Sequence, residues 1–352
     1  MDRARARSRS VTLASRFRNV TLASRSRNVT LARSALAGSF AAGAVLLLAG
    51  ATSAARAYPL RVLRWTDPSA WTEAASRQPP ECLAQPASIR ERDAIEVGRA
   101  AFRTPLLLGG QGARLGLSCE SCHSNGRSNA AFRFAGLSGA PGTADVTSSM
   151  MSSHRGNSVF DPKPIPDLAL PGKVNRSPTS PALRAFVHGL ITEEFDGREP
   201  PATVLDGLVA YVRAIGGAHC AANTTEPVVA ARWIDDANRA MAAARERWQA
   251  GDRAASVIML GAARHALGRL DERYAGKPQD HAALATADAA IARIREDVEA
   301  GGRQTERRML AWSADASQWQ PRLRRDEPQS LFDQTRLARA IAQALPNEQM
   351  AR

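Results

Sequence analysis

Apolar residues recur every three or four positions through the last third of the chain, which is the period of one face of an α-helix. The stripes occupy residues 229–248, 257–274, 284–298 and 309–319, with a shorter one at 337–341. Gly251 and Asp252 separate the first two stripes. Glycine commonly ends a helix, and aspartate commonly caps the start of the next one. The pattern predicts an antiparallel helical bundle of up to five helices over residues 226–345.

Upstream of this bundle, the helical period is found only towards the two ends of residues 58–220. Ser88 and Glu91 have the spacing of a capping box, and an apolar stripe follows them. A second stripe begins after Pro200-Pro201. Residues 104–200, which lie between the stripes, are rich in Gly, Pro and Ser and show little periodicity. We therefore predict a mainly α fold, in which a loop-rich domain with a helix towards each end precedes the helical bundle.

The N-terminus joins a basic segment to an apolar one. Residues 1–33 are rich in Arg and contain Asp2 as their only acid, residues 35–49 are apolar, and Ala55-Arg56-Ala57 forms a small-residue cleavage site. This order predicts a secretory signal peptide over residues 1–57, and hence a periplasmic or secreted protein. A membrane anchor is the alternative, but the apolar stretch is shorter than the roughly 20 residues that a span requires. After cleavage we expect no integral membrane span.

Cleavage would change the charge of the protein. The whole chain carries 47 basic and 34 acidic residues and a formal net charge of +13. The predicted signal peptide holds ten Arg and one Asp, so 37 basic and 33 acidic residues remain, a balance of about +4. The remainder shows no basic stripe with interleaved aromatic residues. We expect no nucleic-acid partner.

The motif with the strongest chemical meaning is Cys119-Glu120-Ser121-Cys122-His123. Two thiols three residues apart can each add to a vinyl group of one haem, and the histidine that follows can bind the iron. The motif predicts one covalent haem c per chain, attached through Cys119 and Cys122 with His123 as an axial ligand.

Two other interpretations of the cysteines were weighed. A redox-active pair would require a strand before the motif and a helix after it, and a zinc site would require a second pair of ligands at matching spacing. The other cysteines, Cys82 and Cys220, stand alone near the two ends of residues 58–220. In an oxidising compartment they most simply form a disulfide with each other, and two free thiols are the alternative.

Several segments around the motif resemble one protein family. Gly98 to Leu108 and Leu117 to His123 are similar to the opening of the bacterial di-haem cytochrome c peroxidase and MauG-like family. Asn175 to Thr179 and Phe195 to Arg198 are similar to its later motifs. The resemblance covers about residues 90–215 and implies a cytochrome c-like fold for the loop-rich domain. The family's peroxidases use two haems, whereas this chain has a single haem motif, which counts against peroxidase activity.

The second axial ligand is less well defined by sequence. His154 precedes the Asn175–Thr179 segment, as the distal histidine does in the family, and it is the preferred candidate for binding the metal. Met150 and Met151 are the alternatives, because the same loop could present a thioether instead. Arg155 and Arg198 are weaker candidates for cofactor binding, through contacts with the haem propionates.

These observations predict an exported mono-haem c-type cytochrome that passes single electrons between redox partner proteins. The alternatives are a peroxidase-like haem oxidoreductase and a haem-bearing sensor or interaction protein. Whether the chain is an enzyme stays open, because no catalytic acid–base residue can be assigned from the sequence.

Overall fold

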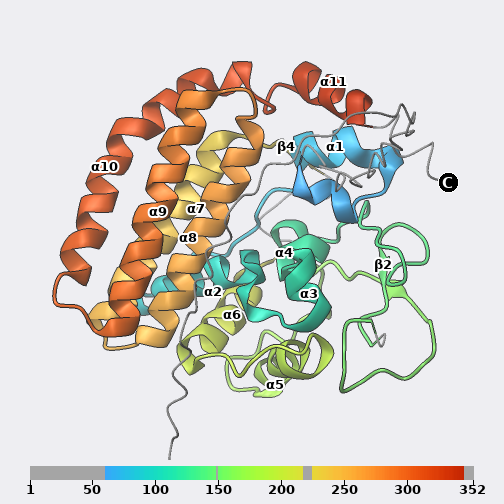
Figure 1. Cartoon of the computed structure of the whole chain (residues 1–352). Coiled ribbons are helices and arrows are strands. Elements are labelled where there is room, and N and C mark those ends of the chain that lie inside the picture. The colour runs from blue at the N-terminus through green and yellow to red at the C-terminus, as the bar shows by residue number, and fades with distance from the viewer. Residues whose placement is uncertain (1–59, 148–149, 217–223, 345–352) are drawn as a thin grey trace, which may run out of the picture. The chain divides into compact units, whose positions relative to one another are not determined.

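The computed structural model describes residues 60–147, 150–216 and 224–344, which leaves the predicted signal peptide outside the described part. Helices dominate the described residues, and the strands are only two residues long, so the prediction of a mainly α fold is confirmed (Figure 1). The α-helices are α1 (Trp71–Ser76), α2 (Ile89–Arg103), α3 (Gly110–Leu115), α4 (Cys119–Cys122), α5 (Ala182–Gly189), α6 (Ala202–Ala214), α7 (Ala230–Gln249), α8 (Arg253–Arg273), α9 (Pro278–Ala300), α10 (Thr305–Asp326) and α11 (Gln334–Ala344).

Short elements connect these helices. A π-helical turn, Leu190–Glu194, follows α5 directly. Strand β1 (Arg77–Gln78) pairs antiparallel with β4 (Glu226–Pro227), and β2 (Thr143–Ala144) pairs antiparallel with β3 (Lys163–Pro164). Single 3-10 turns lie at Arg61–Trp65, Pro68–Ala70, Pro105–Leu107, Ser124–Gly126 and Glu327–Gln329. The β1–β4 pair joins the first part of the described chain to the segment that leads into α7.

Helices α7 to α10 form the predicted bundle. Each helix packs against the next, and α10 packs back against α7, which closes a four-helix arrangement (Figure 1). Small residues make close packing possible, since Ala240 and Ala244 of α7 and Ala263 of α8 are buried in the core. Two buried aromatic side chains have their polar atoms satisfied, since the Tyr274 hydroxyl donates to the Leu323 carbonyl at 2.6 Å and the Trp312 indole donates to the Ala287 carbonyl at 3.1 Å.

The fifth predicted helix has a different partner. Helix α11 packs against α1, far from α1 in sequence, where Leu337 and Ile341 join Leu60, Leu63 and Trp71 in a separate apolar cluster. Its apolar stripe is buried as predicted, but against the first described residues of the chain and not against the bundle. The amphipathic pattern specifies a face to be buried and leaves open which surface buries it.

Helices α2 and α6 cross at a pair of glycines. The Ser88 side chain caps α2 by accepting from the Glu91 amide at 3.1 Å, as the capping-box spacing predicted. At the crossing, a Cβ atom on Gly98 would lie 1.9 Å from the Gly207 carbonyl oxygen. Only glycine permits this approach, and it brings Phe102 of α2 against Tyr211 of α6, with ring centroids 5.1 Å apart.

The helices of the two predicted domains share one hydrophobic core. Helix α2 packs on α6 on one side and on α7 and α8 on the other, and all of them contribute buried side chains to a common cluster, named here the main cluster. The helices on either side of the predicted boundary therefore share one core. Among the described helices, none combines the length and the apolar character needed to cross a membrane.

Candidate functional site

The Cys119–His123 motif forms a single capped turn of helix. Ser118 and Ser121 make a reciprocal capping box at its start, in which the Ser118 amide donates to the Ser121 hydroxyl at 3.1 Å. The His123 amide closes the turn on the Cys119 carbonyl at 2.9 Å. Residues three apart on a helical turn lie on the same side, so the local sequence presents both thiols together.

Each thiol borders a different apolar region. Cys119 packs against the main cluster, which includes Phe102 and Tyr211. Cys122 packs against a second group of apolar side chains, named here the loop cluster. The buried members of the loop cluster are Trp65, Leu108, Leu117, Phe132, Leu137, Ala144, Met151 and Ile165. The motif therefore lies where two apolar regions meet, which is a suitable environment for a large apolar cofactor.

The thiols of Cys119 and Cys122 are half-buried and protonated near pH 7. Cys119 and Cys122 are both free, and burial raises the pKa of each thiol to about 12. A redox-active pair or a zinc site requires thiolates, which form where the pKa is lowered. Within the described ranges, no group of three or more His, Cys, Asp or Glu residues is arranged to hold a metal ion.

The His123 ring is oriented by a residue from a distant loop. Its Nδ1 lies 3.1 Å from the Pro166 carbonyl oxygen, and because a carbonyl only accepts, Nδ1 must carry the proton. Nε2 then holds the free lone pair, which is the tautomer that binds a metal through Nε2. Burial lowers the pKa of His123 to about 4, against the hydrogen bond to Pro166, so the ring is neutral near pH 7.

The loop that carries Pro166 is itself fixed on both sides. The Ile165 amide donates to the Gly142 carbonyl at 2.9 Å, and the Leu168 amide donates to the Gly126 carbonyl at 3.0 Å. Arg127 pairs with Asp167 at 2.7 Å. Pro166 had no signal of its own in the sequence analysis, since a backbone carbonyl 43 residues from the histidine has no sequence pattern.

The candidates for the second axial ligand lie in one loop but in different surroundings. Met151 is 1% exposed and belongs to the loop cluster beside Cys122. Met150 is 37% exposed. The side chain of His154 is 63% exposed, and its Nε2 lies 3.9 Å from an Asp196 carboxylate oxygen. Of the three, only Met151 turns into the apolar region that contains Cys122.

This loop is held by the segment that contains Asp196. The Asp196 carboxylate accepts from the Ser153 amide at 2.9 Å and from the Ser153 hydroxyl at 2.9 Å. Asp196 has a positive φ of 50°, and Gly197 follows it with no room for a side chain, because a Cβ there would lie 2.3 Å from the Leu107 carbonyl oxygen. The Asp-Gly pair therefore makes the tight turn that orients this carboxylate.

The two arginines considered for propionate binding, Arg155 and Arg198, lie in different surroundings. Arg155 forms ion pairs with Glu193 and, at 2.7 Å, with Glu194. These ion pairs help to fix the loop that carries Met150, Met151 and His154. Arg198 is exposed. Arg176 donates to the Leu168 and Ile215 carbonyls, each at 2.6 Å, which fastens the loop after Pro166 to the end of α6. These contacts are structural, and the role of Arg155 and Arg198 toward a cofactor stays a prediction.

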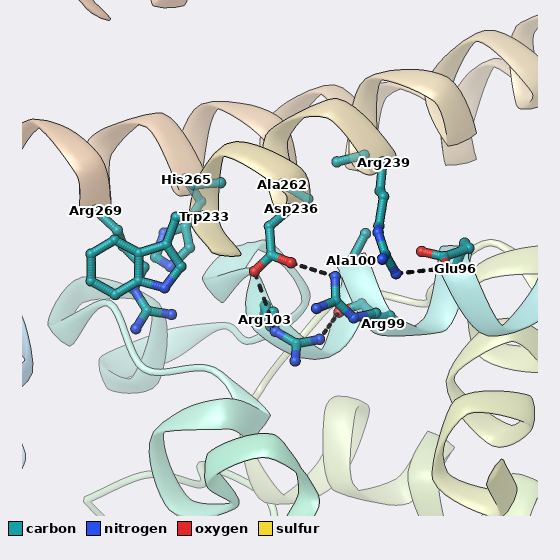
Figure 2. A pocket seen from close by; sticks show the side chains of 12 residues that line it. Glu96, Arg99, Ala100, Arg103, Trp233, Asp236, Arg239, Ala262, His265 and Arg269 are labelled. Carbon is teal, nitrogen blue, oxygen red and sulfur yellow. Dashed lines mark hydrogen bonds and ion pairs between the residues drawn. The ribbon is translucent and has the colours of Figure 1, made fainter. Parts of the chain in front are cut away.

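A buried network of charges links α2 to the helical bundle. Arg99 and Arg103 of α2 both contact Glu81, at 2.9 and 2.7 Å. Both also pair with Asp236 of α7 (Figure 2). Burial alone would raise the pKa of Glu81, but the two arginines and a hydrogen bond from the Tyr211 hydroxyl lower it well below its ordinary value. Tyr211 is therefore committed to this network and to packing on Phe102.

The same network reaches the haem motif. Arg103 donates to the Asn125 side-chain oxygen at 2.9 Å, and the Asn125 amide donates to the Glu120 carboxylate at 3.1 Å. Asn125 has a positive φ of 51°, so these bonds hold a strained turn directly after His123. The polar residues that follow the motif thus fix the exit of the chain from the Cys119–His123 turn.

Of the two remaining cysteines, Cys82 is disulfide-bonded. Its predicted partner, Cys220, lies outside the described residues. Because Cys119 and Cys122 are free, the bond of Cys82 leaves the haem motif intact.

Comparisons with known proteins found no matching family model, no matching characterised protein and no matching solved structure. The site must therefore be interpreted from its own geometry.

Proposed function

We propose that this chain is an exported c-type cytochrome that binds one haem covalently and transfers single electrons between partner proteins. The observation that carries the proposal is the hydrogen bond from His123 Nδ1 to the Pro166 carbonyl, made by the histidine of a Cys-x-x-Cys-His turn. It supports an imidazole prepared to bind iron through Nε2, since histidines that bind metals commonly donate their other ring N–H to such an acceptor.

The surroundings of the motif fit the proposed cofactor. Cys119 and Cys122 border two apolar regions, which suits the body of a porphyrin, and the α2–α6 crossing places Phe102 6.5 Å from the His123 ring, measured between centroids. When bound, a haem supplies an iron that changes its charge by one electron. The cytochrome c-like nature of the domain rests on this combination of a haem motif with two crossing helices.

We further propose Met151 as the second axial ligand, in place of His154. Met151 is buried beside Cys122, whereas the side chain of His154 is largely exposed and faces Asp196. A thioether ligand gives a higher reduction potential than a second imidazole, so this assignment favours an electron carrier of high potential. Ser152 and Ser153, held by the 193–196 segment, would keep the thioether in position.

Covalent attachment is tested directly. Haem staining after denaturing electrophoresis should show the colour migrating with the parent chain and absent from the C119A/C122A variant. A Cys82→Ala variant is the control, because it removes a cysteine outside the motif, and it should keep the stain. Colour that acid–acetone extraction removes from the parent would overturn the proposal.

The ligand assignment is tested by the spin state of the oxidised iron, measured by electron paramagnetic resonance. Met151→Ala should convert a low-spin haem to high-spin or water-ligated haem, because the iron loses a strong-field ligand. Met150→Ala and His154→Ala should leave the low-spin signal unchanged. If His154→Ala alone removes it, the sequence-based choice of His154 is right and Met151 is only a packing residue. A parent that is already high-spin would instead favour peroxidase-like chemistry.

A further inference from the structure

A cavity lies beside the Cys119–His123 turn. It has a volume of about 250 Å³, and its wall includes Ser118, Glu120 and Ser121 of the motif turn, but neither cysteine and not His123. The opposite wall comes from the bundle and contains Trp233 of α7 and Arg269 of α8. The cavity is therefore separate from the haem site that we propose.

The arginines on the wall of this cavity differ in their ion-pair and hydrogen-bond partners. Arg61 pairs with Glu272, Arg77 donates to Thr225 at 2.8 Å, and Arg273 donates to the Leu331 carbonyl at 2.8 Å. For Arg269, the described residues provide neither an ion pair nor a hydrogen bond, only a stacking contact. Its guanidinium carbon lies 4.4 Å from the centroid of the Trp233 ring.

Figure 2 shows, on the side facing α2, that Arg269 differs from the neighbouring arginines in its contacts. Ion pairs are drawn for Arg99, Arg103 and Arg239, whereas Arg269 lies against the Trp233 ring with no such contact. Burial lowers the pKa of Arg269, and the nearby carboxylates of Glu120, Asp236 and Glu272 oppose this effect without making a hydrogen bond to the guanidinium. Arg269 is half-buried and has no hydrogen-bonded partner among the described residues, and stacking on an aromatic ring only partly replaces the water that its guanidinium has lost. A bound anion would supply the missing partner.

The rest of the wall indicates the shape of that anion. Leu60, Val62 and Trp65 provide apolar surface, and Ser124 and Ser128 provide hydroxyl groups. A cavity of about 150 Å³ in another protein holds benzene, so this larger one has room for a ring or a short carbon chain together with a charged group.

The charge of the wall limits the charge of the ligand. Glu120 lies on the wall with Arg269, so a dianion such as phosphate would meet repulsion as well as attraction. One unpaired guanidinium matches one carboxylate, with which it can form two parallel hydrogen bonds. We infer that this cavity binds a small organic monocarboxylate with an apolar body, held by Arg269 stacked on Trp233.

Access to the cavity is provided at its rim. Glu73 and Arg77 both line it, and their side chains are 69% and 35% exposed. The inference goes beyond the proposed electron transfer and needs no haem, so its test does not depend on that proposal.

Benzoate and benzamide are suitable probes, because they share a shape and differ in charge. Titration calorimetry on the mature protein, in a chloride buffer of fixed ionic strength, should give saturable benzoate binding at least about tenfold tighter than benzamide binding, the scale of one charge-assisted hydrogen bond. Arg269→Gln should weaken benzoate to the level of benzamide. Arg264→Gln is the matched control, since Arg264 lies on the same helix but pairs with Asp288 outside the cavity, and it should leave binding unchanged.

Three results would overturn the inference. They are the absence of benzoate binding by the parent, equal affinity for benzoate and benzamide, and equal loss of benzoate binding in the Arg264 and Arg269 variants. Should Arg269→Gln fail to fold, Arg269→Lys keeps the charge but lacks the planar fork, and it should weaken benzoate by about threefold or more without affecting benzamide. Unchanged benzoate affinity in that variant would also reject the role of Arg269.

Discussion

The bundle of α7 to α10 and the loop-rich segment 104–200 are stabilised in different ways. In the bundle, each helix buries an apolar stripe that its own sequence specifies, and neighbouring helices are joined by short connections. In residues 104–200, the loop cluster gathers single side chains from turns far apart in the sequence, such as Leu108, Phe132 and Met151. Backbone hydrogen bonds between turns hold these residues in place.

This difference predicts which region would depend on the haem that we propose. The bundle has a core of its own side chains, while the loop-rich segment has few helices and two half-buried cysteines between apolar regions. We expect the bundle to be stable without haem and the loop-rich segment to gain much of its order from it. The four predictions that follow test this contrast and the contacts that join the two regions.

The largest effect is expected from loss of haem attachment. In the C119A/C122A variant, amide hydrogen exchange measured by mass spectrometry should rise strongly over residues 104–200 and remain low over α7 to α10, because only the first region would lose part of its core. The parent protein produced without haem insertion is the control and should show the same pattern. An equal rise in both regions would mean that the two regions fold only as a unit.

The next largest effect concerns the ion pairs between α7 of the bundle and α2, the helix that precedes the loop-rich segment. Asp236 is 11% exposed and pairs with Arg99 and Arg103, so Asp236→Ala leaves two buried cations to share the single carboxylate of Glu81. Glu81 stays as a carboxylate partner of both arginines, so we expect the free energy of unfolding to fall by about 2–4 kcal/mol, measured with urea. Asp288→Ala is the matched control, because its pair with Arg264 is about one third exposed on both sides, and it should cost about 1 kcal/mol or less. Similar losses would show that the buried network is no more important than a surface pair.

A smaller effect is expected at the glycine crossing. Gly98→Ala would force a methyl group into the Gly207 carbonyl and push α6 away from α2, at a cost of about 1–3 kcal/mol in thermal or urea unfolding. Gly268→Ala in α8 is the control, because its methyl group would meet only the flexible end of Arg61, 3.1 Å away. That variant should be neutral or slightly stabilised by its better helix propensity. No difference between the two variants would contradict the close crossing.

The smallest effect is a pH dependence due to His265 of α8. Burial, together with the nearby Arg269 and Arg61, lowers the pKa of His265 from 6.5 to about 3. As pH falls below 6.5, the unfolded chain takes up a proton that the folded chain refuses, so the free energy of unfolding decreases until about pH 3. At pH 5 this loss amounts to at most about 2 kcal/mol.

His265→Gln should remove that contribution, so that the free energy of unfolding varies less between pH 7 and pH 4. Urea unfolding at each pH measures this dependence. His281→Gln, which changes a half-exposed histidine of α9, controls for loss of an imidazole elsewhere. A parallel downward shift of the whole profile, with its slope unchanged, would show that His265 contributes packing and no proton linkage.

The predictions from sequence were most successful where the pattern is local. The period of the apolar stripes located α7 to α10, and the Ser88 capping signal located the start of α2. The prediction of Cys82 as a disulfide-bonded residue is confirmed, although its partner lies outside the described residues. The choice of His154 as iron ligand relied on motif order alone, which does not report the direction of a side chain.

The sequence by itself determined the helices and the Cys119–His123 turn, because helical period, capping and the spacing of the thiols all depend on residues within one or two turns. Only the tertiary structure decided which distant groups meet: Pro166 with His123, Gly207 with Gly98, Asp236 with Arg99, and Trp233 with Arg269. A local pattern states that a face must be buried or a charge paired. The partner is chosen by the packing of the whole chain, where contacts between residues far apart in sequence first become possible.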